Sequence, residues 1–261
     1  MNIQISIVTI CSNRLDYLKR TIPTFLNQSF SELIVVDYNC PQGTAEFVRK
    51  NYQTARIIQI KDGNKFNLSK ARNIGAQEAK GEFIFFCDAD ILLKEDICAW
   101  ITALSIKNCF FTSSKMDDSY GSCIISKKVF SQISGYDEAF EDWGGEDRDL
   151  YQRLEWAGLK ALNYPENFLS PIYHDDTIRL IRSISKKDQI IFNSLYREVK
   201  YDLMRFFNRN LSVKERIQLY SKIKSIFLNP NYQSLEISLP TRLLEIKNIK
   251  KTFQYTLNKR V

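Results

Sequence analysis

The chain has 261 residues, of which 44% are hydrophobic and 13% aromatic, enough for one large domain or for one domain with an appendage. No apolar run is long enough to span a bilayer, and the N-terminal residues lack the basic segment of a signal peptide, so we expect neither a membrane-spanning helix nor secretion. The six cysteines show no CxxC spacing, which indicates reduced thiols in a cytoplasmic protein.

The net charge of +7 is unevenly distributed along the chain. Residues 1–176 contain 19 Lys and Arg against 24 Asp and Glu, a net charge of −5, whereas residues 177–261 contain 18 against 6, a net charge of +12. This split predicts an acidic body over residues 1–176 and a basic extension over residues 177–261. It points to an anionic partner for the extension, while the acidic body argues against nucleic acid as the main partner.

Strand-like and helical segments alternate through the first part of the chain. Buried strands are predicted at residues 4–9, 33–37 and 56–60, and in the apolar run that begins at Phe83 and stops at Asp88. The segments between them carry apolar residues at helical spacing, and Ser69 is predicted to cap the third helix. Short connections between alternating elements require a mostly parallel sheet with helices on both faces. The expected fold is therefore doubly wound α/β, and the absence of GxGxxG and GxxxxGK[ST] disfavours dinucleotide and P-loop classes.

The strand predicted from Phe83 onward stops at Asp88 and Asp90, two carboxylates that flank Ala89. Side chains at alternate positions of an extended chain project from the same side, so these anions repel and need a cation. A hard divalent ion suits oxygen ligands and usually also holds substrate phosphates. The alternative is a strand end followed by a loop with solvated acids. The same edge of the sheet receives Asp37, and ligands bind at this edge in open α/β folds.

A segment rich in glycine and acids lies at residues 135–149, ahead of a helix expected to begin near Leu150. Its central residues are Trp143, Gly144, Gly145, Glu146 and Asp147. One interpretation is helix capping, because acids suit a helix N-terminus. The other is a platform with a base: the indole face stacks on a sugar ring while a carboxylate takes a proton. The single histidine, His174, follows, and it would complete a metal site begun by Asp88 and Asp90.

The extension beyond residue 177 shows amphipathic helical patterns at residues 178–203, 212–227 and 242–260. Four roles are open for it. Its basic residues would face an anionic membrane while Phe and Leu enter the surface, or they would hold an acidic or lipid-diphosphate-linked acceptor. Alternatively, its helices would contact a partner, or they would cap the body with a solvated basic face.

Five segments, in this order along the chain, resemble motifs of family 2 glycosyltransferases with the GT-A fold. They are Val8–Arg14, Ile34–Asp37, Ala71–Ala76, Asp88–Asp90 and Trp143–Asp147. The last is similar to the corresponding segment of β-1,4-galactosyltransferases and of the transferase domains of bacterial chondroitin polymerases. The resemblance covers roughly residues 3–176. It implies a GT-A domain over residues 1–176, followed by a basic α-helical extension that matches no named module.

The resemblance implies an inverting, metal-dependent transferase that moves galactose or an N-acetylhexosamine from a UDP-sugar to a hydroxyl of a glycan or lipid-linked acceptor. Mn²⁺ or Mg²⁺ is the implied ion, and surface polysaccharide synthesis on the inner face of the cell membrane is the implied setting. The residues implied to contact the nucleotide-sugar are Thr9, Cys11, Arg14, Asp37, Arg72, Asp88, Ala89 and Asp90. Those implied to contact the donor sugar or acceptor are Gly121, Trp143, Gly144, Gly145 and Glu146.

Asp147 matches the catalytic base of the inverting galactosyltransferases, and the implied metal ligands are Asp88, Asp90 and His174. The chain departs from the pattern at Pro171, where those enzymes have a methionine ligand. It also has Cys11 and Ser12 where many relatives carry Pro-Thr-Tyr-like residues.

Two other classes stay open on the sequence. A nucleotidyltransferase of related fold also uses carboxylates and a metal, but its first loop is usually rich in Gly, Lys and Arg, unlike Cys11–Arg14. A GT-A relative that has lost catalysis would only bind a sugar or a partner. Retention of Asp88, Asp90, Asp147 and His174 argues against this second class.

Overall fold

The computed structural model of the chain describes residues 4–29, 32–62, 65–104, 108–114, 119–141, 144–173, 185–229, 234–238 and 252–256. Two candidate residues, Trp143 and His174, lie outside these ranges, and so does the predicted domain boundary after residue 176. The chain forms two compact units, Met1–Ile190 and Ile191–Val261. None of the described helices is long and apolar enough to cross a membrane.

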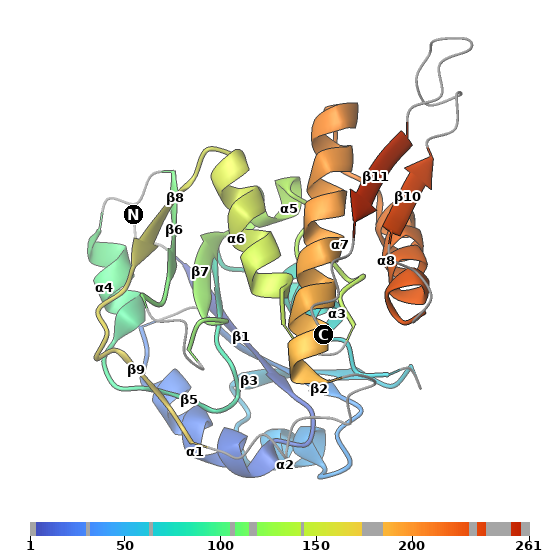
Figure 1. Cartoon of the computed structure of the whole chain (residues 1–261). Helices are drawn as coiled ribbons and strands as arrows, with labels where there is room; N and C mark the ends of the chain where they lie inside the picture. The colour runs from blue at the N-terminus through green and yellow to red at the C-terminus, as the bar shows by residue number, and fades with distance from the viewer. Residues whose placement is uncertain are drawn as a thin grey trace. The chain divides into compact units, whose positions relative to one another are not determined.

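The first unit is built on a seven-stranded sheet with the order β3-β2-β1-β4-β7-β6-β8 (Figure 1). Its strands are β1 (Ile5–Cys11), β2 (Glu32–Tyr38), β3 (Ala55–Ile60), β4 (Phe83–Phe86), β6 (Cys109–Thr112), β7 (Cys123–Ser126) and β8 (Lys160–Asn163). The neighbours among β1 to β4 pair in parallel, β7 is antiparallel to both β4 and β6, and β8 is parallel to β6. The predicted mostly parallel sheet is confirmed.

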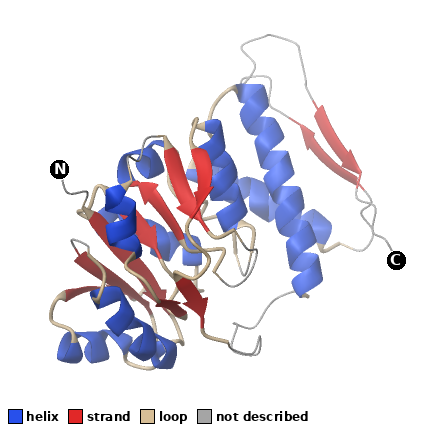
Figure 2. Ribbon diagram, turned by 90° about the vertical axis from the view of Figure 1, so that its left-hand side faces the viewer, coloured by secondary structure: helices blue, strands red, loops and turns tan. Residues whose placement is uncertain are grey.

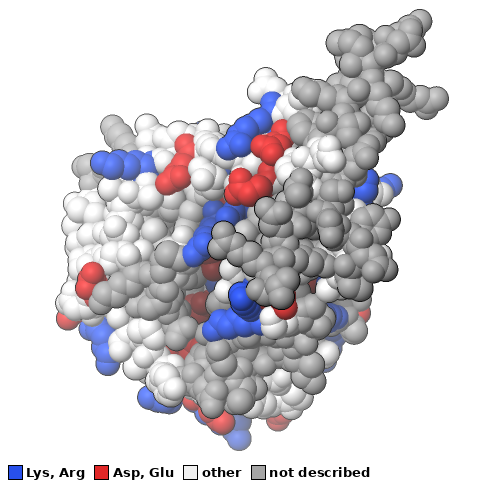
Figure 3. Space-filling view, in the orientation of Figure 1, with Lys and Arg blue, Asp and Glu red and all other residues white. Residues whose placement is uncertain are grey.

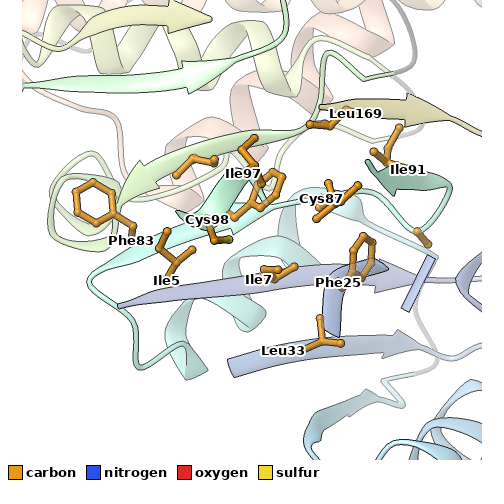
Figure 4. Packing of buried hydrophobic residues seen from close by; sticks show 14 of the residues in the cluster. Ile5, Ile7, Phe25, Leu33, Phe83, Cys87, Ile91, Ile97, Cys98 and Leu169 are labelled. Atoms are coloured by element: carbon orange, nitrogen blue, oxygen red, sulfur yellow. The ribbon is translucent and has the colours of Figure 1, made fainter. Parts of the chain in front are cut away.

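Helices cover both faces of this sheet, as predicted (Figure 2). They are α1 (Leu15–Leu26), α2 (Thr44–Asn51), α3 (Leu68–Glu78), α4 (Ile97–Ala103), α5 (Lys127–Gln132) and α6 (Glu146–Trp156). One buried cluster joins the sheet to α1, α2 and α4, and a second joins it to α3, α5 and α6. Figure 4 shows part of the first cluster, in which Ile5 and Ile7 of β1 pack near Leu33 of β2 and Phe25 of α1. Alternate β1 residues serve the two faces because successive side chains of a strand point in opposite directions.

Two helices begin at residues other than those predicted. Asn67, not Ser69, is the N-cap of α3, and its side chain accepts the Lys70 backbone N–H at 2.8 Å. Helix α6 begins at Glu146 rather than near Leu150. The acids of this segment therefore belong to the first helical turn, so their positions relative to the sheet are fixed by the helix.

A second, two-stranded sheet follows the end of β4. Strand β5 (Ile91–Leu93) pairs with β9 (Leu169–Pro171) in antiparallel register, with Ile91 opposite Pro171. The Ile172 N–H donates to the Asp90 carbonyl at 2.8 Å and extends this pairing. The backbone of the Asp88–Asp90 segment is therefore held from both sides, by β4 and by this small sheet.

In the second unit, helices α7 (Lys186–Phe207, which begins in the first unit) and α8 (Val213–Phe227) precede the antiparallel pair β10 (Ser234–Ser238) and β11 (Thr252–Thr256). The two helices pack through aromatic rings. The centre of the Tyr220 ring of α8 lies 4.8 Å from the centre of the Phe192 ring and 5.0 Å from that of Tyr196, both on α7. The two helices confirm the predicted helical extension. The prediction of a helix over residues 242–260 is wrong at β11, where aromatic and β-branched residues suit a strand.

Candidate active site

Acidic and basic side chains from four parts of the first unit meet at the carboxyl edge of its parallel strands. Asp88 and Asp90 follow β4, and Arg14 precedes α1 in the loop after β1. Arg72 comes from α3, and Asp147 from the first turn of α6. Parallel strands bring their carboxyl ends to one edge of the sheet, which is where open α/β folds bind ligands.

Arg72 interacts with three carboxyl groups at this edge, those of Asp88, Asp147 and the neighbouring Glu146. Its side chain is 1% exposed, and Nη1 donates to Asp147 Oδ1 at 2.7 Å while Nη2 donates to Asp88 Oδ1 at 2.9 Å. Nη1 also lies 3.9 Å from Glu146 Oε1. A guanidinium can be buried this deeply because charged hydrogen-bond partners replace its hydration. We call Arg72, Asp88, Glu146 and Asp147 the Arg72 cluster.

Gly121 lies directly against this cluster. Its carbonyl oxygen is 3.5 Å from Arg72 Nη2. A Cβ added to Gly121 would lie 2.9 Å from Arg72 Nη2 and 3.1 Å from both Asp88 Oδ2 and Asp147 Oδ2. The missing side chain therefore leaves a small space bordered by two carboxylate oxygens. Gly121 therefore lies next to the Arg72 cluster, and its contact with a substrate stays a prediction.

The glycine pair before α6 sets the direction of the two acids that follow it. Gly144 and Gly145 have φ values of 90° and 101°, a backbone conformation that residues other than glycine rarely adopt. Gly145 is the N-cap and provides no side-chain hydrogen bond. Glu146 and Asp147 therefore occupy a helix N-terminus, which favours negative charge, while their side chains engage Arg72.

The two acids of the cluster have raised pKa values. Burial raises the pKa of Glu146 to about 8, and repulsion by Asp147 adds to this, against an opposing effect of Arg72. Burial also raises the pKa of Asp147, while Arg72 opposes the rise and Asp88 adds to it. Because Asp147 accepts a direct hydrogen bond from Arg72 at 2.7 Å, we assign the ionised state to Asp147 and the proton to Glu146 at neutral pH.

Tyr136 and Asn73 also belong to the site, although neither was among the residues predicted for it. The Arg72 guanidinium lies 4.9 Å from the centre of the buried Tyr136 ring, and the Tyr136 hydroxyl is a hydrogen-bond partner of Asp147. Asn73 holds Tyr136 by two bonds: Tyr136 N–H to Asn73 Oδ1 at 2.8 Å and Asn73 Nδ2 to the Tyr136 carbonyl at 3.0 Å. The position of Asn73 next to Arg72 could have indicated a role at the site. Its hydrogen-bond partner Tyr136, however, lies 63 residues away in the sequence.

Asp90 and Arg14 form an ion pair at the same edge. Ala89, between the two aspartates, is buried, and its carbonyl accepts a hydrogen bond from Thr21 Oγ1 at 2.9 Å. Asp88 is thus paired with Arg72, and Asp90 with Arg14. The positive charge that two neighbouring carboxylates require is supplied in this structure by two arginines.

The remaining residues predicted to contact the nucleotide are buried. Thr9 and Cys11 are 0% exposed, and Asp37 is 4% exposed. The Asp37 carboxylate accepts the backbone N–H groups of Cys40 at 2.9 Å and Ala45 at 3.0 Å, so it holds the turn between β2 and α2. Contact of Thr9, Cys11 and Asp37 with a nucleotide stays a prediction.

The donor set at this edge fits a hard divalent cation. Asp88 and Asp90 offer carboxylate oxygens, and the Asp88 side chain is 30% exposed, so solvent reaches it. In the part of the chain that the structure describes, no group of three or more His, Cys, Asp or Glu could hold a metal ion. Asp88 and Asp90 would therefore hold Mn²⁺ or Mg²⁺ together with water or substrate oxygens, as Mg²⁺ sites usually do.

Comparison with known protein families covers the whole of this site. Residues 6–101 match glycosyl transferase family 2, and residues 108–175 match a family described as the N-terminal domain of galactosyltransferase. Every candidate residue lies within these two ranges. The fold and the site thus define a glycosyltransferase domain of the GT-A type. The first of these regions is similar to family 2 glycosyltransferases, and the region after the Asp88–Asp90 segment is similar to galactosyltransferases.

The similar proteins with known activities are glycosyltransferases. The chain is 34% identical over 98 residues to the poly(ribitol-phosphate) beta-N-acetylglucosaminyltransferase TarP of Staphylococcus aureus. The aligned region covers 35% of this chain and 30% of TarP. Over 114 residues the chain is 30% identical to beta-1,4-galactosyltransferase 1 of Mus musculus, covering 40% of this chain and 29% of that enzyme. The chain thus spans about three tenths of the length of these relatives.

Solved structures share the fold. S. aureus TarS 1-349 in complex with UDP-GlcNAc matches with a TM-score of 0.62 and 15% identity, covering 85% of this chain and 71% of that one. GalNAc-T7 with UDP, GalNAc and Mn²⁺ matches with a TM-score of 0.60 and 15% identity, covering 88% and 56%. These likenesses establish the GT-A architecture.

Proposed function

We propose that this chain is an inverting, metal-dependent glycosyltransferase that moves galactose or an N-acetylhexosamine from a UDP-sugar to an acceptor hydroxyl. The observation that carries the proposal is the Arg72 cluster. It brings Asp88, which follows β4, and Asp147, in the first turn of α6, to one guanidinium. In this proposal one carboxylate, Asp88, serves donor binding and another, Asp147, serves proton abstraction. The two must lie close together, and the Arg72 cluster holds them so.

Asp147 is the proposed base. It would take the proton of the acceptor hydroxyl while that oxygen attacks the anomeric carbon and the bond to the diphosphate breaks. Its raised pKa suits a base near neutral pH, and its bonds to Arg72 and Tyr136 fix its orientation. A single displacement of this kind inverts the configuration at the anomeric carbon.

Asp88 and Asp90 are the proposed residues for the metal ion, joined by His174, which lies outside the described residues. A divalent cation there would neutralise the leaving diphosphate. Arg14 and Arg72, which pair with these two aspartates, lie close enough to the same edge to contact donor phosphates as well.

The donor and acceptor classes rest on the relatives. TarP is an N-acetylglucosaminyltransferase on poly(ribitol-phosphate), the mouse enzyme is a galactosyltransferase, and TarS was solved with UDP-GlcNAc. We therefore propose a UDP-sugar donor and a glycan or lipid-linked acceptor in surface polysaccharide synthesis. The proposed setting is the inner face of the membrane, with the basic extension toward an anionic acceptor or lipid. Figure 3 shows both basic and acidic side chains among the described residues of the face in view.

Calorimetric titration of UDP, with and without Mn²⁺, tests the donor site. We expect Mn²⁺-dependent binding to the wild type and its loss in Asp90→Ala. Asp16→Asn is the control, because the Asp16 side chain is 80% exposed on α1 and pairs only with Lys19 in the described structure. Absence of UDP binding in the wild type under both conditions would contradict the proposal and favour another nucleotide or a non-catalytic role.

Asp147→Asn tests the base separately from donor binding. The amide keeps the shape of the side chain but cannot accept the proton, so we expect UDP binding to persist while transfer falls by at least about 10²-fold. Transfer is followed by UDP release from UDP-GlcNAc and UDP-Gal in the presence of oligosaccharide and polyol-phosphate acceptors. Transfer at the wild-type rate by Asp147→Asn would refute the assignment of the base.

A further inference from the structure

Two cysteines meet at the carboxyl edge, in the loops after β1 and β2. Cys11 at the end of β1 is directly opposite Asp37 of β2 in the sheet register. The chain then turns back, because Asp37 Oδ1 accepts the Cys40 backbone N–H at 2.9 Å. This turn brings Cys40 back against the buried cluster that contains Cys11, so the two thiols lie next to each other. Both thiols are free in the structure.

Several hydrogen-bond donors face the Cys40 sulfur, and the Cys40 thiol itself points to Gln42 Oε1 at 3.9 Å. The Asn13 backbone N–H points to it at 3.3 Å, and the Gln42 backbone and the Thr44 hydroxyl are further partners. Thr44 also lies 3.2 Å from the Cys11 sulfur and is the first residue of α2. A helix N-terminus and several convergent donors stabilise a thiolate more than a thiol.

The ionisation of the two sulfurs follows from this arrangement. The hydrogen bond from Cys11 is the largest cause that lowers the pKa of Cys40, to about 5, and Thr44, Gln42 and Asn13 add to it against the effect of burial. The pKa of Cys11 is raised by the same hydrogen bond, by burial and by the charge on Cys40. The other charged groups at these loops are Asp37, bound to the Cys40 N–H, and Arg14, whose backbone contacts Cys11.

We propose that Cys40 is a thiolate that hydroperoxides oxidise, with Cys11 as the thiol that converts the product into a disulfide. The Cys40 thiolate attacks the outer oxygen of the hydroperoxide, the O–O bond breaks, and the alkoxide or hydroxide leaves and takes a proton. Cys40 is then a sulfenic acid. The Cys11 sulfur attacks the Cys40 sulfur, the S–O bond breaks, water leaves, and a Cys11–Cys40 disulfide forms.

Solvent exposure distinguishes Cys40 from the other five cysteines. Cys40 is half-buried, so a small oxidant can reach its sulfur, and Cys11 is buried directly beside it. The remaining four are buried: Cys87, Cys98, Cys109 and Cys123. When Cys40 becomes a neutral sulfenic acid, the charge that raises the pKa of Cys11 disappears, which favours the second step. A transient disulfide of this kind is compatible with a reducing compartment.

The first test is the pH profile of alkylation by iodoacetamide, read at Cys40 by peptide mass spectrometry of the full chain. Between about pH 6 and pH 8 the Cys40 rate should change by less than about two-fold, whereas free glutathione gains about ten-fold per pH unit. The four buried cysteines serve as internal controls for unfolding. A Cys40 rate that rises with pH in parallel with glutathione would overturn the proposal.

The second test is exposure to hydrogen peroxide, and it is independent of sugar transfer. The wild type should lose the mass of two hydrogen atoms and yield a Cys11–Cys40 linked peptide, reversed by dithiothreitol. In Cys11→Ser the hydroxyl still donates to Cys40, so the flat alkylation profile should persist, while dimedone traps a Cys40 sulfenic acid instead of a disulfide. Peroxide treatment that leaves both sulfurs as thiols in the wild type would overturn the proposal.

Discussion

Replacement of Arg72 by methionine removes the buried cation that the carboxyl groups of Asp88, Glu146 and Asp147 share. Arg72 is 1% exposed and donates at 2.7 Å to Asp147 and at 2.9 Å to Asp88. Loss of one partner from a buried ion pair costs about 3–5 kcal/mol, because the other charge stays buried without compensation. We therefore expect Arg72→Met to lower the free energy of unfolding of the first unit by about this amount.

Urea unfolding followed by tryptophan fluorescence measures this loss. All three tryptophans belong to the first unit, so the fluorescence signal reports that unit alone. The centre of the Trp100 ring lies 5.5 Å from the centre of the Phe111 ring. Arg56→Met is the matched control: the Arg56 side chain is 38% exposed and pairs with Glu78, so its loss should be below about 1 kcal/mol.

A double variant separates charge from packing. Arg72→Met with Asp147→Asn also removes one uncompensated carboxylate, so it should recover about 1.5–3 kcal/mol relative to Arg72→Met. The loss in Arg72→Met should also shrink at low pH, where the carboxyl groups are protonated. Equal losses in Arg72→Met and Arg56→Met, or no recovery in the double variant, would refute the role assigned to Arg72.

Three further changes test separate parts of the structure. Gly121→Ala places a methyl group 2.9 Å from Arg72 Nη2, so we expect a loss of about 1–3 kcal/mol in the same urea assay, together with reduced transfer. Because the pKa of Glu146 is raised from 4.5 to about 8, the stability provided by its protonated form is complete below pH 4.5 and is lost as pH rises to 8. Glu146→Gln should therefore be more stable than wild type at about pH 9 by up to about 5 kcal/mol, with little difference near pH 4, as thermal unfolding would show. Ser212→Ala removes one half of the capping box of α8 and should cost about 1 kcal/mol in circular dichroism melts, with the tryptophan signal unchanged.

The sheet could be predicted from the sequence because its central strands are buried on both faces and read as continuous apolar runs. The apolar run from Phe83 that stops at Asp88 was predicted as a strand, and it contains β4, Phe83–Phe86. The strand ends then placed the acids at one edge, since parallel strands end together. Helix starts were less predictable: Asn67 and Ser69 are both good caps, and only the backbone geometry decides between them.

The pairings within the site could not be predicted. Arg72 lies 75 residues from Asp147 and 16 from Asp88, and no local pattern states which acid a buried arginine will meet. The role of Tyr136 was hidden for the same reason. At β11 the helical prediction failed because a short segment of alternating aromatic and β-branched residues was attributed to the preceding amphipathic pattern.

The charge balance of the site connects its structure to the proposed reaction. Arg14 and Arg72 each neutralise an aspartate of the Asp88–Asp90 segment, and Glu146 takes a proton, so the ionised Asp147 leaves this edge with about one negative charge. A UDP-sugar adds the negative charge of its diphosphate to this edge, where both arginines are already paired. A divalent cation on Asp88 and Asp90 would replace the arginines as their partner and release the guanidinium groups toward the phosphates. On this reasoning, metal and UDP should bind with positive coupling, each raising the affinity for the other by the same factor.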